Sequence, residues 1–164
     1  MMRIGTGSDT HRLRPGLPLV IGGVTIRHSK GFQAHSDGDI LIHAIIDALL
    51  GAMGKGDIGT HFPDTNPRWK NVKSTVMMQA VMSLLHHAGF SIVNLDCTIH
   101  AQRPKLAPHI PHMVDILAGH LKISPQQINI KAKTGEQIGF IGREEGMHAQ
   151  ATVLIHQEKT HPGN

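Results

Sequence analysis

The chain has 164 residues, of which 40% are hydrophobic, and this size and composition fit one domain with a single core. Cys97 is the only cysteine, so a disulfide within the chain and a zinc site built from several thiolates are both excluded. Nitrogen and oxygen atoms must therefore hold any metal. The net charge of +4 favours an anionic partner.

The same composition argues against two classes of partner. Aromatic residues make up 3% of the chain and the basic residues are scattered, so a small phosphorylated ligand fits better than stacked nucleic-acid bases. No window holds the roughly 18 uninterrupted apolar residues of a membrane helix, and the first residues lack the apolar run of a secretion signal. We therefore expect a cytoplasmic protein that binds neither nucleic acid nor membrane.

Strand patterns come first along the chain. Residues 3–11 favour a strand, and two short β-branched runs within residues 19–26 meet at a Gly-Gly pair, as in a hairpin. Residues 40–53 then carry apolar side chains at helical spacing. The polar residues 36–39 directly before them can cap this helix.

The rest of the chain alternates helices and strands. Glycines, prolines and an Asp-Thr-Asn-Pro run predict a long loop over residues 54–73, of a kind that often carries function. Further on, the sequence predicts a helix that Ser74 caps and that extends to His87, a strand over 90–102, a helix over 110–122, and strands over 128–134 and 147–155.

These elements sum to an α+β domain. We expect a two-layer sandwich, in which about three helices cover one face of one mixed sheet. Residues 1–157 are assigned to this domain, and residues 158–164 to a flexible C-terminal tail.

Three residues near the N-terminus indicate a metal site. Asp9 and His11 are two apart on a predicted strand, so both side chains point to one face, and His43 lies near the start of the first helix. They offer one oxygen and two nitrogens, a set that suits zinc and leaves a position open for water or substrate. The alternative is coincidence, because this chain has 14 histidines.

Two further segments place polar groups near this set. Residues 35–39 precede the first helix, so their amides and the Ser36 hydroxyl either face a phosphate at the helix N-terminus or only cap the helix. Asp57 and Asp64 lie in the long loop, where carboxylates suit sugar hydroxyls or a divalent ion better than a phosphate. Their alternative role is to form turns.

The later motifs are less specific. The run GAMGKG lacks the spacing and the hydroxyl residue of a P-loop, which excludes that class of nucleotide triphosphatase. Residues 133–136 end a strand and offer a hydroxyl and amides to phosphate, and a carboxylate to a cation. Arg143 stands beside Glu144 and Glu145, an arrangement most common in ion-paired surface turns.

Taken together, the motifs resemble the 2-C-methyl-D-erythritol 2,4-cyclodiphosphate synthase family over nearly the whole chain. Each piece is weak alone, but the ordered set is specific. The matching pieces are SDTH at 8–11, AHSDGD at 34–39, HAIIDALLGA at 43–52, GDIG at 56–59, FPDT at 62–65, Gln102, Pro104, Lys105, PHIPHM, KAKTGE, GFIGR and EG.

The resemblance implies roles for the matching residues. The three candidate metal ligands correspond to zinc ligands, and Glu136 to a position associated with a second divalent ion, Mg²⁺ or Mn²⁺. His35 and Thr134 are implied to stabilise the transition state. Other implied contacts with substrate are Ser36 at the phosphate, Asp57, Ile58, Gly59, Phe62 and Asp64 around the methylerythritol part, and Ala101, Lys105, Leu106, Ala107, Ala132 and Lys133 around the cytidine.

The implied reaction is an intramolecular cyclisation. The substrate is a cytidine-diphosphate sugar alcohol, whose 2-phosphate attacks the β-phosphate of its own diphosphate arm and expels CMP. The resemblance also implies a homotrimer with active sites at the subunit interfaces. An isoprenoid phosphate is implied on the threefold axis, near Phe140, Arg143 and Glu145.

The chain departs from the family pattern at three positions. Lys133 and Gly135 replace common threonines, which is expected to strengthen phosphate attraction and remove hydroxyl contacts. Glu144 replaces a common glycine, and its carboxylate is expected to disfavour an anion on the axis.

Two other functions stay open on sequence alone. A zinc phosphohydrolase would use the open metal position to activate water and would release linear products. A non-catalytic trimeric module that binds isoprenoid phosphates would keep Arg143 and tolerate loss of Asp9 and Lys105.

Overall fold

The computed structural model describes residues 1–157, and the tail predicted at residues 158–164 lies outside the described residues. The strands are β1 (Met2–Pro15), β2 (Leu19–Ile21), β3 (Val24–Ile26), β4 (Lys30–Gln33), β5 (Phe90–His100), β6 (Ile128–Lys133) and β7 (Gly146–Gln157). The α-helices are α1 (Ile40–Met53), α2 (Ile58–His61), α3 (Ser74–His87), α4 (Ile110–Leu121) and α5 (Gly139–Gly142), and 3-10 turns cover Pro67–Trp69, Ala107–His109 and Pro125–Gln127.

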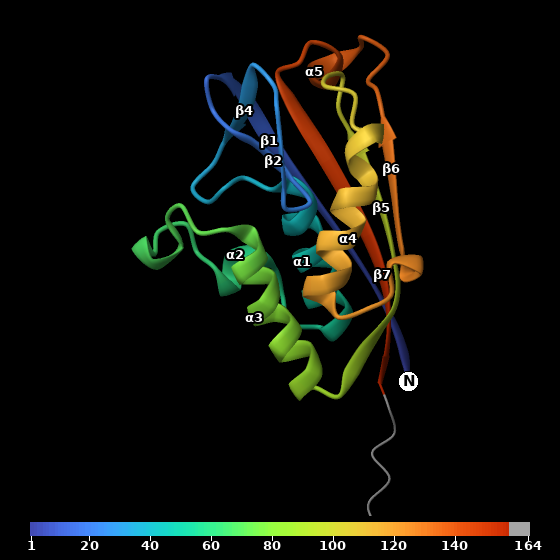
Figure 1. The fold of residues 1–164 in the computed structure, drawn as a ribbon. Coiled ribbons are helices and arrows are strands. Elements are labelled where there is room, and N and C mark those ends of the chain that lie inside the picture. Colours follow the sequence, from blue (N-terminus) through green and yellow to red (C-terminus); the bar gives the residue numbers. More distant parts are fainter. Residues whose placement is uncertain (158–164) are drawn as a thin grey trace, which may run out of the picture.

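Five strands form one mixed sheet in the order β4-β1-β7-β5-β6, and β2 and β3 form a separate hairpin. β5 and β6 run parallel, which requires a crossover that α4 supplies, and the other neighbours in the sheet run antiparallel. Figure 1 shows α1, α3 and α4 gathered on one side of this sheet, with α1 lying along β1 and β7. The α+β class and the mixed sheet are therefore confirmed.

Most predicted boundaries hold. The helix over 40–53 and the Gly-Gly hairpin are confirmed. The first strand is longer than predicted, because Arg12–Pro15 continue it by pairing with β4. The long loop contains α2 and a 3-10 turn, and Phe62 packs edge to face against Trp69 with ring centroids 4.9 Å apart. The buried face of β7 is the predicted one: Met147, Ala149, Ala151, Val153 and Ile155.

Ser74 does not cap the second long helix, so that prediction is wrong. The N-cap of α3 is Lys73, which makes no side-chain cap bond, and Ser74 is the first helical residue and fully buried. Asp37 accepts the backbone N–H of Ser74 at 3.0 Å instead. A carboxylate from a distant segment therefore replaces the local cap.

Asp39 begins α1 and ties the hairpin to it. Its carboxylate accepts the N–H of Ile42 at 3.0 Å and those of Gly22 and Gly23 at 2.9 and 2.7 Å. Burial raises the pKa of Asp39 to about 6, although the three hydrogen bonds act in the opposite direction. One buried carboxyl group thus holds the β2–β3 turn at the start of α1. The cap predicted within residues 36–39 is Asp39.

Glycine and alanine make the contact between α1 and β1. A methyl group at Gly5 would overlap the carbonyl oxygen of Ala48 and lie 2.6 Å from the amide nitrogen of Ala52. At Gly7 it would overlap the carbonyl oxygen of Ala44 and lie 2.6 Å from the amide nitrogen of Ala48. No side chain separates helix from strand here. This contact therefore sets the distance between the side chains of β1 and those of α1.

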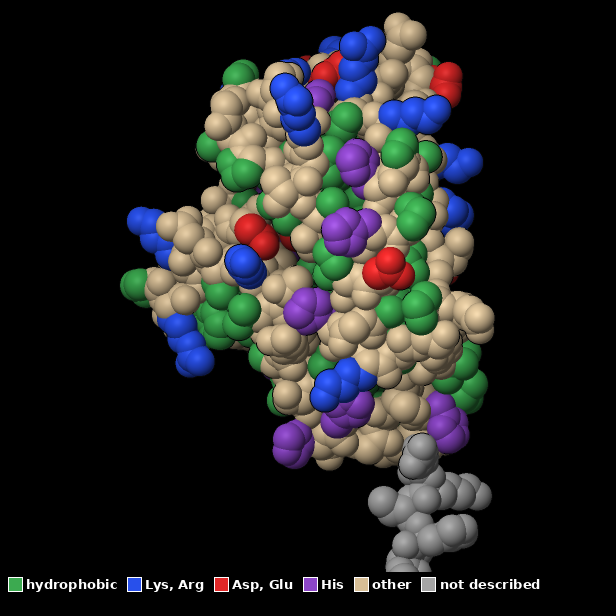
Figure 2. Space-filling model, in the orientation of Figure 1, with side chains coloured by type: hydrophobic (Ala, Val, Ile, Leu, Met, Phe, Trp, Pro, Cys, Tyr) green, Lys and Arg blue, Asp and Glu red, His purple; other side chains and the backbone are tan. Residues whose placement is uncertain are grey.

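Several histidines are visible on the helix side of the molecule. Figure 2 shows them spread over α3 and α4, with the Lys and Arg side chains distributed around them. Among the described residues, no helix has both the length and the apolar character that crossing a bilayer requires.

Substitution of Gly7 by alanine tests the contact between α1 and β1. We expect Gly7→Ala to lower the free energy of unfolding by about 1–3 kcal/mol, because the methyl group overlaps helix backbone that is fixed by the core. Urea unfolding followed by circular dichroism measures this change. Gly51→Ala is the matched control: its methyl group would lie 3.8 Å from the Thr6 carbonyl, so it should stabilise α1 by up to about 1 kcal/mol. Equal stability of Gly7→Ala and wild type would contradict the assignment.

Candidate active site

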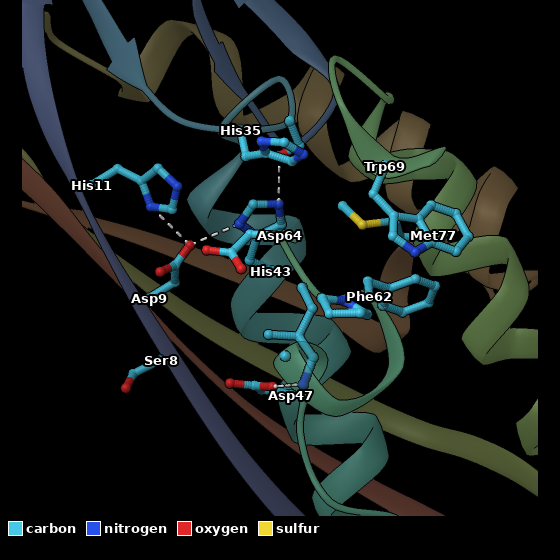
Figure 3. A pocket seen from close by; sticks show the side chains of 14 residues that line it. Ser8, Asp9, His11, His35, His43, Asp47, Phe62, Asp64, Trp69 and Met77 are labelled. Carbon is cyan, nitrogen blue, oxygen red and sulfur yellow. Dashed lines mark hydrogen bonds and ion pairs between the residues drawn. The ribbon is translucent and has the colours of Figure 1, made fainter. Parts of the chain in front are cut away.

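The three predicted metal ligands meet where β1 passes the first turns of α1. The Nδ1 atoms of His11 and His43 lie 3.0 and 2.9 Å from the same carboxylate oxygen, Oδ2 of Asp9. One ligand atom of each residue lies within 4.8 Å of the others. Figure 3 shows the two rings approaching the Asp9 carboxylate from different sides. The predicted meeting of the three side chains is confirmed.

His11 supplies a test of whether this cluster suits a cation. Its Nδ1 atom is buried and has no well-aligned hydrogen-bond partner, although it lies 3.0 Å from Asp9. A buried nitrogen without a hydrogen bond is costly, and an ion bound between the nitrogen and the carboxylate would satisfy both. Two imidazoles and one carboxylate are also a donor set that zinc takes in proteins. The residues present therefore fit a divalent transition metal.

Burial and the attraction between the charged groups shift the pKa values of this cluster in opposite directions. Burial disfavours the charge on Asp9, but the adjacent imidazoles of His11 and His43 outweigh it and hold the pKa of Asp9 well below its usual range. Burial also lowers the pKa of His43, yet the Asp9 carboxylate more than compensates and the net shift is upward. Without a metal, His43 therefore tends to carry a proton that keeps the buried carboxylate paired.

A set of hydroxyl groups surrounds the other nitrogen of His43. Its Nε2 atom lies 2.9 Å from Ser74 Oγ and 3.3 Å from Ser36 Oγ. The Ser74 hydroxyl donates to Asp37. Sequence reasoning missed Ser74 and Asp37 as neighbours of the site, because nothing local in the sequence shows that the start of α3 lies against the loop before α1.

A cavity of about 450 Å³, called the first cavity here, opens beside the cluster. Figure 3 shows Phe62, Trp69 and Met77 on the side opposite Asp9 and His11. The cavity therefore has one polar and one apolar wall. Of the predicted site residues, those that line it are Asp9, His11, His35, Ser36, His43, Ile58, Gly59, Phe62 and Asp64.

The two loop aspartates differ in position. Asp64 lines the first cavity, whereas Asp57 does not and instead caps α2 by accepting the N–H and the hydroxyl of Thr60, both at 2.8 Å. This is the turn-forming role left open for Asp57. Asp47 of α1 lines the cavity and accepts the Ile58 N–H at 2.7 Å. Sequence reasoning missed Asp47, although its spacing of four residues from His43 puts both on one helix face.

A second cavity of about 700 Å³ lies at the ends of β5 and β6. It brings together every residue that the resemblance implied around a cytidine: Ala101, Lys105, Leu106, Ala107, Ala132 and Lys133, together with Thr134. His28 and Arg103 also line it and were not predicted. No lining residue is common to the first and second cavities. The implied catalytic pair is thus divided, with His35 in the first cavity and Thr134 in the second.

A third cavity of about 500 Å³ contains Phe140 and Arg143 and has a strongly charged lining. Arg143 donates two hydrogen bonds to Glu145, at 2.8 and 3.3 Å, so the ion-paired turn is confirmed. Glu144 lies 4.0 Å from Lys30 and 3.7 Å from Arg103. These cations partly neutralise the carboxylate that was expected to repel an axial anion.

Glu136 lies outside the three cavities. It sits in the turn after β6 at a positive φ of 50° and accepts a hydrogen bond from Thr134 Oγ1 at 2.7 Å. Its carboxylate is exposed. Within one chain, Glu136 is therefore connected to the second cavity through Thr134 and has no contact with the metal cluster.

Metal affinity of this cluster should fall as the pH falls. Because the Asp9 carboxylate raises the pKa of His43 above its ordinary value of 6.5, a metal must displace a proton from His43 at any pH below that raised pKa. We expect the dissociation constant for Zn²⁺ to rise by about tenfold for each pH unit below that pKa. Competition titrations against a chelator at several pH values between 6 and 8 measure it. An affinity that does not change over this range would contradict the shift.

Comparison with known sequences gives a consistent match. The sequence pattern of the YgbB family matches residues 2–156. The 2-C-methyl-D-erythritol 2,4-cyclodiphosphate synthase of Bacillus pumilus is 50% identical over 96% of this chain and 100% of its own length. The synthase of Geobacillus kaustophilus is 53% identical, over 94% and 98% respectively.

Solved structures agree with the sequence match. A structure of 2C-methyl-D-erythritol-2,4-cyclodiphosphate synthase has a TM-score of 0.87 and 40% identity, covering 94% of this chain and all of that one. The CDP complex of IspF from Plasmodium falciparum has a TM-score of 0.86 and 32% identity, covering 96% and 97%.

Proposed function

The chain belongs to the YgbB family, and from this premise we propose that the Asp9 cluster, the first cavity and the second cavity of a neighbouring subunit form its active site. The chain is an enzyme. It converts 4-diphosphocytidyl-2-C-methyl-D-erythritol 2-phosphate to 2-C-methyl-D-erythritol 2,4-cyclodiphosphate and CMP, in isoprenoid precursor biosynthesis by the non-mevalonate pathway. The observation that carries the site assignment is the convergence of two imidazoles on one buried carboxylate oxygen beside a cavity.

The reaction needs little proton transfer. A new bond joins an oxygen of the 2-phosphate to the β-phosphorus, and the bond from the β-phosphorus to the CMP oxygen breaks. A phosphate monoester has a second pKa near 6, so at about pH 7 the attacking group is already largely dianionic. Catalysis therefore depends on holding two phosphates of one molecule together and on neutralising their charge.

Asp9, His11 and His43 would hold the metal, and the donor set favours Zn²⁺ over Mg²⁺. When bound, such an ion acts as a Lewis acid that withdraws charge from a phosphate oxygen. The family resemblance and the buried, unbonded Nδ1 of His11 support this role. Mg²⁺ or Mn²⁺ would accompany the substrate diphosphate, with Glu136 as its protein ligand.

The walls of the first cavity suit the rest of the phosphorylated sugar alcohol. His35 and Ser36 would donate to the β-phosphate, and Asp64 would accept from the hydroxyl groups. The apolar wall, with Ile58, Gly59 and Phe62, would pack against the methyl-bearing carbon chain. Asp57 would act through its cap of α2, which positions Ile58 and Gly59, since its carboxylate is already bonded to Thr60.

The second cavity would bind the cytidine end. Relatives have been solved with CDP bound, which supports a cytidine nucleotide as part of the substrate. Lys105 and Lys133 would attract the diphosphate, Thr134 would donate to the transition state, and the small side chains of the lining would admit the base. Gly135 is required by packing, because a methyl group there would lie 2.8 Å from the Gly142 amide nitrogen.

Association into a homotrimer would complete the site. The two cavities share no lining residue within one chain, which supports a neighbouring subunit as the source of Thr134 and Lys105 at the metal. The sheet face away from the helices is free for this contact, and it carries Ile4, whose exposed fraction is 68%. The third cavity would then lie near the axis and hold an isoprenoid phosphate through Arg143, with Phe140 against the chain.

Product analysis tests the reaction together with the metal site. Purified protein incubated with the substrate, Zn²⁺ and Mg²⁺ should release CMP and a cyclic diphosphate, both resolved by phosphorus NMR. His43→Ala should lose Zn²⁺ and at least about 100-fold in turnover, because a ligand of the Lewis acid is gone. His120→Ala is the control and should behave as wild type, because His120 lines none of the three cavities and its ring contacts only Gln79 of α3 among the described hydrogen bonds. Linear products would support a phosphohydrolase, and a fully active His43→Ala protein without zinc would refute the ligand assignment.

Mixed trimers test where the site lies. His43→Ala damages the metal half and Lys105→Ala the nucleotide half, and each protein alone should be nearly inactive. If the halves come from neighbouring subunits, each mixed trimer contains one intact site, so random mixing should recover about a quarter of wild-type activity. Activity is measured after co-refolding the two variants. If both halves come from one chain, no intact site forms and activity stays at background.

A further inference from the structure

The Nε2 nitrogen of His43 points away from the metal cluster toward two hydroxyl groups, of buried Ser74 and of half-buried Ser36. It lies 2.9 Å from Ser74 Oγ and 3.3 Å from Ser36 Oγ. A neutral imidazole has one nitrogen with a proton and one with a free lone pair, and only the second binds a metal. The nitrogen that keeps its proton therefore decides whether Nδ1 of His43 is available to the cluster.

Asp37 fixes the direction of the Ser74 hydroxyl. An ionised carboxylate only accepts hydrogen bonds, so the bond between Ser74 Oγ and Asp37 Oδ1 uses the Ser74 proton. The Ser74 oxygen then presents lone pairs to His43 and can only accept. Ser74 is fully buried, so water does not compete for these bonds.

We propose that Asp37 and Ser74 are positioning residues for the metal. The order carboxylate, hydroxyl, imidazole keeps a proton on Nε2 of His43, so the proton that a metal displaces is the one on Nδ1, which faces Asp9 Oδ2 at 2.9 Å. The inference rests on the proposed metal role of the cluster. It adds two residues that contact neither the ion nor the substrate.

The same carboxylate also has a structural role. Asp37 accepts the Ser74 backbone N–H at 3.0 Å and so holds the first turn of α3. Ser74→Ala separates the two roles, because it removes the hydroxyl and keeps the backbone N–H. Asp37 can then still hold α3, and only the connection to His43 is lost.

Zinc affinity is the first measurement. In a chelator competition, Ser74→Ala should raise the dissociation constant for Zn²⁺ by about 10- to 100-fold, as loss of an outer partner of a metal-bound histidine does. Ser74→Thr keeps a hydroxyl and should recover affinity. The matched control is Ser83→Ala, since Ser83 lies on the same helix and its hydroxyl bonds only the Gln79 carbonyl.

Asp37→Asn makes a directional prediction. To keep accepting the Ser74 N–H, the amide must turn its oxygen toward the backbone and its NH₂ toward Ser74 Oγ. The serine then donates to Nε2 of His43, which moves the ring proton to Nδ1, where the metal must bind. Asp37→Asn should therefore weaken Zn²⁺ binding more than Ser74→Ala does, although it is the more conservative change.

Nitrogen-detected NMR of the zinc-loaded wild type needs no variant. The expected result is a His43 Nε2–H proton that exchanges slowly with water. In a second measurement, the visible spectrum of Co²⁺-loaded Ser74→Ala should differ from that of Co²⁺-loaded wild type. An unprotonated Nε2, or a Ser74→Ala protein that binds Zn²⁺ within twofold of wild type, would overturn the inference. If wild type itself binds no Zn²⁺ at this cluster, the proposed metal site fails instead, so the two failures are distinguishable.

Discussion

The direct contact of α1 with β1 is the constraint on which the site depends. Because Gly5 and Gly7 have no side chains, the backbone of α1 lies against the strand, and Ala44 and Ala48 fit the remaining space. Two residues further along β1 than Gly7, Asp9 leaves the sheet on the same face. The Asp9 carboxylate therefore lies next to His43, near the start of α1. A larger residue in place of either glycine would move Asp9 and His11 away from His43.

The local patterns that specify this contact are visible in the sequence. A period of two put Asp9 and His11 on one face, and the apolar spacing of residues 40–53 gave the helix its correct bounds. The spacing of Asp47 from His43 was equally visible and was overlooked. What local reasoning could not give is the partner of Ser74: serine before an apolar run is a common N-cap, but here Asp37 supplies the cap from across the fold.

Long-range placement is also what separates the two loop aspartates. Asp57 and Asp64 have the same chemistry in the same loop, and only the packing of α2 decides that one caps a helix and the other faces the cavity. The division of His35 and Thr134 between cavities has the same origin. The family resemblance implied a role for both residues, but it carries no information on which cavity each one lines.

Electrostatics explains why a site for phosphates contains so many carboxylates. Asp9, Asp37, Asp39 and Asp47 lie around the start of α1, and the first three raise the pKa of His43. Such a group would repel a substrate with three phosphates unless a divalent cation compensated it. In the proposed site, a metal held by Asp9, His11 and His43 would compensate this charge and attract the phosphates.

The second cavity, which is the other half of the proposed site, is basic. Lys105, Lys133 and Arg103 line the second cavity, which contains no carboxylate among its lining residues. An acidic surface with a cation and a basic surface with a nucleotide pocket attract each other as well as the substrate. In the proposed trimer, attraction between the acidic surface with its cation and the basic second cavity would therefore stabilise the subunit interface. Substrate bound across this interface would strengthen the association further by mass action.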